Sequence, residues 1–132
     1  MPASWIDEDI AVGVQADAAA WSGWIVNVAQ EFDVAPSHQQ GYVKYGGVVS
    51  GMPILPLVRV VAKIVQFGEK VLIVCGAGMN RSPAVAICTL MHLDDSGDDV
   101  HAENEARRLL RERRSGCVPT ESIIESYKRE VG

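Results

Sequence analysis

The sequence predicts an α/β fold, in which one domain over residues 1–132 contains a central, mainly parallel sheet of about four to five strands flanked by helices. Apolar runs of strand length alternate along the chain with longer segments of helical periodicity. A length of 132 residues is enough for one domain with its own core. Neither an internal repeat nor an interdomain linker interrupts the alternation, so we expect a single unit.

The first part of the chain predicts short strands separated by turns, and one short helix. Apolar runs of strand length lie at residues 5–6, 11–14, 25–29 and 42–49. Gly46 and Gly47 weaken the last of these strands, because glycine adds backbone freedom and has no side chain to pack. Asp17 is expected to cap the N-terminus of a helix over residues 18–21, which Gly23 would end.

The rest of the chain predicts helices and one more strand, at residues 70–75. Segments of helical periodicity lie at residues 53–67, 84–91, 101–114 and 120–131. The second is apolar on nearly every face, which is typical of a central, buried helix. The third carries arginines that we expect on its solvated face: Arg107, Arg108, Arg111, Arg113 and Arg114. Thr120 is expected to cap the last helix.

One stretch between the strand at residues 70–75 and the buried helix carries the strongest chemical signal. Cys75 ends the strand, so its sulfur would lie at the carboxyl edge of the sheet, where open α/β sheets bind ligands. Gly76 and Gly78 allow successive backbone N–H groups to point toward one centre. The helix that starts near Ser82 would favour a bound phosphate and lower the pKa of the thiol. Arg81 can bind two phosphate oxygens with its planar guanidinium.

Residues 75–82 resemble the signature loop Cys-x5-Arg-Ser/Thr of the cysteine-dependent protein tyrosine phosphatase superfamily, and within it the dual-specificity phosphatase family. The similarity extends to Asp17-Ala18, to residues 24–31, which resemble the family's leucine-asparagine-valine strand, and to residues 105–114. It implies a protein phosphatase that hydrolyses phosphotyrosine, with phosphoserine and phosphothreonine as further candidate substrates. In this family, the reaction passes through a phosphocysteine intermediate and needs neither a metal nor another cofactor.

The resemblance also implies roles for individual residues. Cys75 would be the nucleophile, Arg81 would stabilise the phosphoryl oxygens, and Ser82 would hydrogen-bond the sulfur as it departs in the second step. The expected phosphate-binding residues are Gly76, Ala77, Gly78, Met79, Asn80 and Arg81. The loop is neutral apart from the arginine, which favours a singly phosphorylated side chain over inositol lipids or RNA 5′-phosphates.

Two departures from the family pattern bear on activity. Val74 stands where the family usually has histidine, which predicts a thiol pKa higher by about one unit. Residues 46–52, where the family has its general-acid aspartate, contain no carboxylate, and loss of a general acid costs about 10²–10⁴-fold. Asp33 in the preceding loop is the candidate acid, with an ordinary solvent-facing aspartate as the alternative, and Glu31 is a weaker candidate.

Two other functions compete with this interpretation. The departures favour a catalytically impaired phosphatase-like module that binds phosphorylated partners, whereas the intact Cys75, Arg81 and Ser82 argue against it. A sulfurtransferase of rhodanese type also uses a loop-borne cysteine. The sequence Arg81-Ser82-Pro83 and the similar flanking segments favour phosphate chemistry instead.

Composition limits the partners and the compartment. A net charge of −5 argues against general nucleic-acid binding, and no apolar stretch is long enough to span a bilayer. Residues 1–10 lack the features of a signal peptide. The cysteines at 75, 88 and 117 have no pair or metal-ligand spacing, so we expect free thiols in a cytoplasmic protein, with Cys88 in the core. A phosphorylated protein is the expected partner, and oligomeric state stays open.

Overall fold

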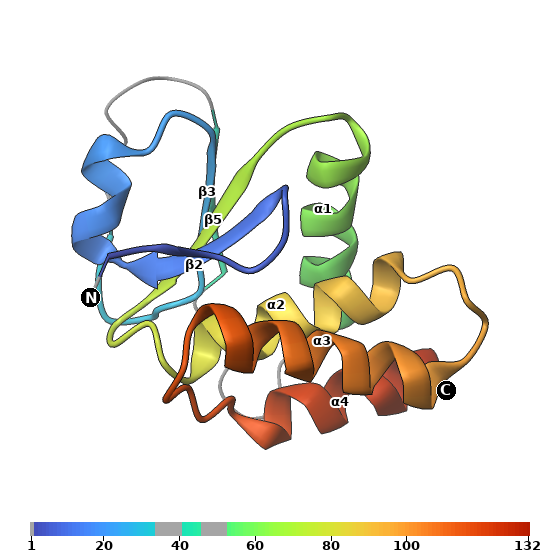
Figure 1. Ribbon diagram of the computed structural model, residues 1–132. Helices are drawn as coiled ribbons and strands as arrows, with labels where there is room; N and C mark the ends of the chain where they lie inside the picture. The colour runs from blue at the N-terminus through green and yellow to red at the C-terminus, as the bar shows by residue number, and fades with distance from the viewer. Residues whose placement is uncertain (1, 34–40, 46–52) are drawn as a thin grey trace.

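The computed structural model describes residues 2–33, 41–45 and 53–132, and five strands within them form one sheet. The strands are β1 (Ser4–Trp5), β2 (Ile10–Val14), β3 (Trp24–Asn27), β4 (Tyr42–Lys44) and β5 (Val71–Cys75). They lie in the order β1-β2-β5-β3-β4, in which β1 pairs antiparallel with β2 and all other neighbours are parallel (Figure 1). The predicted α/β class with a mainly parallel sheet is therefore confirmed.

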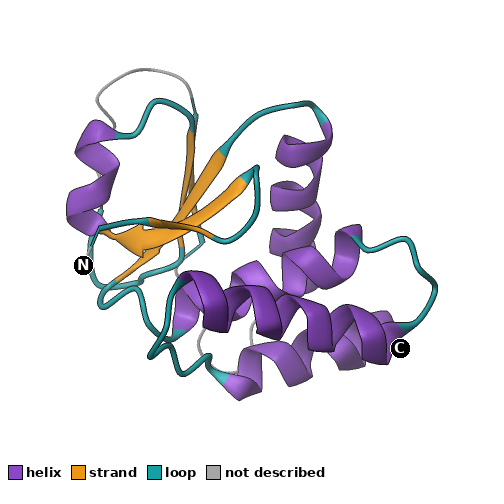
Figure 2. Cartoon of the chain, in the orientation of Figure 1, coloured by secondary structure: helices purple, strands orange, loops and turns teal. Residues whose placement is uncertain are grey.

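Helices cover both faces of the sheet unequally. The helices are the 3-10 helix η1 (Gln15–Ala20), α1 (Leu55–Gln66), α2 (Arg81–Leu93), α3 (Asp99–Arg113) and α4 (Glu121–Val131). Figure 2 shows η1 on one side of the strands and the four longer helices on the other. Within the described ranges, none of these helices is long and apolar enough to cross a lipid bilayer.

The core lies on both faces of the central strand β5, whose five residues are all buried. Successive side chains of a strand point to opposite faces of the sheet, so the residues of β5 alternate between two clusters. Val71, Ile73 and Cys75 belong to the large cluster that includes α1, α2, α3 and α4. Leu72 and Val74 belong to a smaller cluster with Ala18 and Trp21 on the η1 side. Val74 and Cys75 therefore face opposite sides of the sheet, and the helix that follows the cysteine lies on the side of its sulfur.

Three local predictions need correction or limitation. Asp17 does not cap a helix from residue 18; η1 begins at Gln15, and Asp17 Oδ2 instead accepts the N–H of Val14 at 2.8 Å. The carboxylate reaches back because the end of β2 leaves this amide to be satisfied. The predicted strand at 42–49 is observed over Tyr42–Lys44, and residues 46–52 lie outside the described residues. Thr120 occupies the N-cap position of α4 without a side-chain hydrogen bond.

Candidate active site

The parallel strands end at one edge of the sheet, and Cys75 lies there at the end of the central strand. Residues 76–80 form a turn, and α2 begins at Arg81. Cys75 is 2% exposed, and its Sγ lies 3.2 Å from Ser82 Oγ and 3.4 Å from the Ser82 backbone nitrogen. The positive end of a 13-residue helix therefore points at the sulfur.

The environment of Cys75 stabilises its ionised form. Burial raises the pKa of the thiol, but hydrogen bonds to the sulfur from the Ser82 hydroxyl and from the N–H groups of Ser82, Gly78 and Asn80 outweigh burial. The pKa of Cys75 is therefore lower than that of an ordinary cysteine. The loop provides this effect although Val74, and not a histidine, precedes Cys75 and faces the other side of the sheet.

Arg81 forms a two-point ion pair with Glu31 at the mouth of this loop. Its Nη1 donates to Glu31 Oε1 at 2.8 Å and its Nη2 to Oε2 at 2.5 Å. The Arg81 guanidinium lowers the pKa of Glu31 to about 2, so Glu31 carries no proton near neutral pH and is not a general acid in this arrangement. A guanidinium has five N–H groups and this pairing uses two of them, so Nε–H, one Nη1–H and one Nη2–H remain. The remaining Nε–H and Nη2–H lie side by side and suit two oxygens of an anion.

Glu31 reaches Arg81 because Asn27 organises the segment that follows β3. Asn27 is fully buried, and its Nδ2 donates to the carbonyl of Phe32 at 2.9 Å and to Tyr42 Oη at 3.0 Å. Its Oδ1 accepts the N–H of Ala29 at 2.9 Å. The asparagine of the strand that resembles the family motif thus holds the turn that carries Glu31.

Replacing Glu31 with glutamine should lower kcat by about tenfold, because Arg81 is then no longer held in one orientation. The same change removes a negative charge beside Arg81, so we expect KM and the dissociation constant for tungstate, an oxyanion, to fall. Steady-state kinetics and calorimetry on Glu31→Gln measure both quantities. An increase in KM with unchanged kcat would contradict this role.

Asp33, the candidate general acid, lies on the surface. Its Oδ1 pairs with Lys44 Nζ at 2.8 Å, its side chain is 78% exposed, and its carbonyl accepts a hydrogen bond from Gln15 Nε2 at 3.0 Å. Among the described residues, no hydrogen bond or ion pair joins Asp33 to Cys75 or Arg81. This position matches the solvent-facing alternative.

Arg114 contradicts the prediction that it lies on a solvated helix face. It is only 1% exposed, and its Nε donates to the carbonyl of Gly78 in the loop at 2.8 Å. It follows Ala102, Ala106 and Leu110, the buried residues of α3, at a spacing of four. That spacing continues the inward face beyond the end of the helix and is the sequence signal that identifies Arg114 as buried. By contrast, surface pairs hold Arg107 to Glu103 and Glu121, and Arg108 to Glu105 and Glu112.

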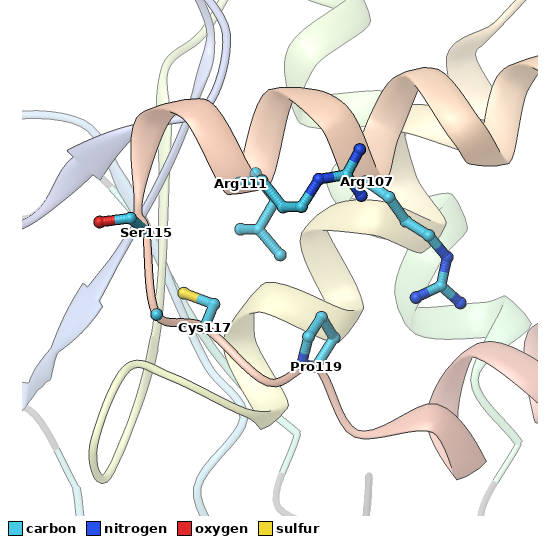
Figure 3. Close-up of a pocket in the computed structure, with 7 residues that line it drawn as sticks. Arg107, Arg111, Ser115, Cys117 and Pro119 are labelled. Atoms are coloured by element: carbon cyan, nitrogen blue, oxygen red, sulfur yellow. The ribbon is translucent and has the colours of Figure 1, made fainter.

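The connection between α3 and α4 packs against the same loop. The N–H of Val118 donates to Met79 O at 2.9 Å, and Asn80 Nδ2 donates to Val118 O at 2.6 Å. Cys117 Sγ lies 3.9 Å from Met79 Sδ, and burial raises the pKa of the Cys117 thiol. Figure 3 shows Cys117 and Pro119 opposite Arg107 and Arg111 around a cavity of about 350 Å³. Cys88, as predicted, is a fully buried core residue.

Comparison of the fold with solved structures finds phosphatases and phosphatase-like proteins. The human tyrosine phosphatase-like serine/threonine/tyrosine-interacting protein is 16% identical, with a TM-score of 0.75 over 98% of this chain and 95% of its own. Human DUSP28 is 15% identical, with a TM-score of 0.78 over 97% and 96%. OH1 from the Orf virus, a tyrosine phosphatase, is 17% identical, with a TM-score of 0.68 over 97% and 84%.

No protein-family model and no curated protein sequence matches the chain. The solved structures nevertheless match over nearly the whole length of both chains. The chain therefore shares its fold with solved dual-specificity phosphatase structures.

Proposed function

We propose that the protein is a phosphatase that hydrolyses phosphotyrosine in proteins, with phosphoserine and phosphothreonine as further candidate substrates, through a phosphocysteine intermediate on Cys75. One observation carries the proposal: the buried Cys75 sulfur accepts hydrogen bonds from Ser82 and from loop amides, at the N-terminus of the helix that Arg81 begins. The fold shared with known phosphatases supports the same assignment. A reducing compartment such as the cytoplasm suits the three free cysteines.

In the first step, the Cys75 thiolate attacks phosphorus in line with the ester bond. A sulfur–phosphorus bond forms while the phosphorus–oxygen bond to the tyrosine breaks, and the leaving oxygen keeps the electron pair. The adjacent Nε–H and Nη2–H of Arg81, which the pairing with Glu31 leaves available, and the amides of the loop bind the equatorial oxygens. In the second step, water attacks the phosphocysteine and the sulfur leaves as a thiolate, which the Ser82 hydroxyl stabilises from 3.2 Å.

A second candidate function is a module that binds phosphorylated partners without turnover. Its support is the absence of a carboxylate in residues 46–52 and the fold shared with a human protein described as phosphatase-like. Burst kinetics with an aryl phosphate separate the two functions. Release of more than one equivalent of phenol per protein requires an enzyme, whereas a single equivalent or none supports the binding module.

The dependence of the rate on the acidity of the leaving group tests whether the protein lacks a general acid. Because no described carboxyl group contacts Cys75 or Arg81 in a protonated state, we expect kcat/KM to fall by about 10²–10⁴-fold from an activated aryl phosphate to a phosphotyrosine peptide. Asp33→Asn should keep kcat/KM for each of the two substrates within about twofold of the unsubstituted protein, because Asp33 pairs with Lys44 on the surface. Assays of both substrates with both proteins provide the comparison. A selective loss of peptide hydrolysis in Asp33→Asn would identify Asp33 as the acid.

A further inference from the structure

The guanidinium of Arg114 lies buried beneath the loop that follows Cys75. Its Nε donates to Gly78 O at 2.8 Å, and its Nη1 donates to Pro2 O at 2.7 Å and to Ser4 Oγ at 2.9 Å. Arg114 thus joins the loop to residues that precede it by more than 70 positions in the chain. Its Nη2 has no hydrogen-bond partner among the described residues, and no carboxylate in that part of the chain pairs with it.

A buried cation without a carboxylate partner is costly, so packing alone does not account for an arginine at this position. An apolar residue would continue the inward face of α3 that Ala106 and Leu110 begin. Arg114 donates to two backbone carbonyl oxygens, which only a donor can hold, and to one hydroxyl.

The hydrogen bond to Gly78 O determines the orientation of the peptide between Gly78 and Met79. This peptide is trans, so its N–H points away from the side on which its carbonyl meets Arg114. The N–H groups of Gly78 and Asn80 on either side both point to the Cys75 sulfur. Gly78 has a φ of +68°, and a Cβ there would lie 2.8 Å from Arg114 Nη2 and 2.9 Å from Gly13 O, so the loop fits closely around the guanidinium.

We propose that Arg114 is a positioning residue, which keeps the N–H of Met79 directed at the bound phosphoryl group by holding the carbonyl of Gly78 on the opposite side. Pro2 and Ser4 hold the guanidinium in turn, so the N-terminal segment is part of the support of the anion site. The effect on catalysis rests on the proposed phosphatase function. The effect on oxyanion binding does not, and it is measured separately.

The test compares Arg114→Met, which removes all the donors at similar length, with the matched control Arg113→Met on the exposed face of the same helix end. Loss of one oriented oxyanion donor costs about 10²–10³-fold in kcat, so we expect this loss for Arg114→Met. We also expect at least about tenfold weaker tungstate binding by calorimetry, because the Met79 amide then turns freely. KM should change less than kcat, and Arg113→Met should bind tungstate like the unsubstituted protein.

Ser4→Ala keeps the proposal testable where Arg114→Met does not fold, because it removes only one bond to Nη1. We expect about threefold weaker tungstate binding with unchanged secondary structure by circular dichroism. If Arg114→Met folds and binds tungstate as tightly as the unsubstituted protein, the proposal is overturned. If Arg114→Met does not fold, undiminished tungstate affinity in Ser4→Ala overturns it. If neither the unsubstituted protein nor any variant turns over substrate, the phosphatase function is overturned. The positioning role of Arg114 still holds in that case if Arg114→Met or Ser4→Ala binds tungstate more weakly as expected.

Discussion

Replacing Cys75 with serine is expected to reduce phosphatase turnover by at least about 10⁴-fold while tungstate binding stays within about threefold. The hydrogen bonds from Ser82 and the loop amides lower the pKa of the Cys75 thiol and so favour the nucleophilic thiolate, whereas a serine hydroxyl stays protonated in the same position. Arg81 and the loop amides, which we propose bind the anion, are unchanged in this variant. Steady-state kinetics and calorimetry on one preparation measure the two effects.

The control for this substitution is Cys88→Ala, which removes another buried thiol from the helix that begins at Arg81. Cys88 is fully buried among apolar residues, and burial raises the pKa of its thiol well above the ordinary value. We expect Cys88→Ala to lower the free energy of unfolding and to retain kcat. Full turnover in Cys75→Ser would show that the nucleophile is a different group.

Replacing Arg81 with alanine is expected to reduce kcat/KM by about 10³-fold or more and to weaken tungstate binding by at least about tenfold. The substitution removes the cation that we propose binds the equatorial oxygens, and it also leaves the Glu31 carboxylate without its partner. Arg81→Lys should recover only part of the loss, because a lysine ammonium has no planar pair of donors for two oxygens.

Arg108→Ala serves as the control for Arg81→Ala. Arg108 also forms carboxylate pairs, with Glu105 and Glu112, but these lie on the exposed face of α3. Exposed pairs contribute little to stability, so this variant should keep its turnover and its tungstate affinity. Equal losses in the two variants would mean that general charge, rather than the position of Arg81, supports the reaction.

The sequence was sufficient for the main architecture because its strongest signals are local. The apolar strand of Val71–Cys75 and the apolar helix after it predict a buried centre, and the loop between them predicts where the sulfur lies. The ion pair of Glu31 with Arg81 was not predicted, because it joins residues 50 positions apart through a turn that Asn27 holds. The spacing of four from Leu110 to Arg114 does indicate an inward position. A charged residue is nevertheless expected on the surface, because the sequence does not show that a backbone carbonyl, that of Gly78, accepts its hydrogen bond in the interior.

Mass spectrometry of protein quenched with acid during turnover of an aryl phosphate detects the covalent intermediate itself. It is therefore the sharpest test of a phosphocysteine mechanism on Cys75. The proposed mechanism predicts a phosphoryl group on the Cys75 peptide and none in Cys75→Ser. It predicts more phosphorylated Cys75 in Ser82→Ala, because the departing sulfur there loses the hydroxyl at 3.2 Å. Turnover with no phosphoryl group on Cys75 in any of these proteins, or with the group on another residue, would contradict it.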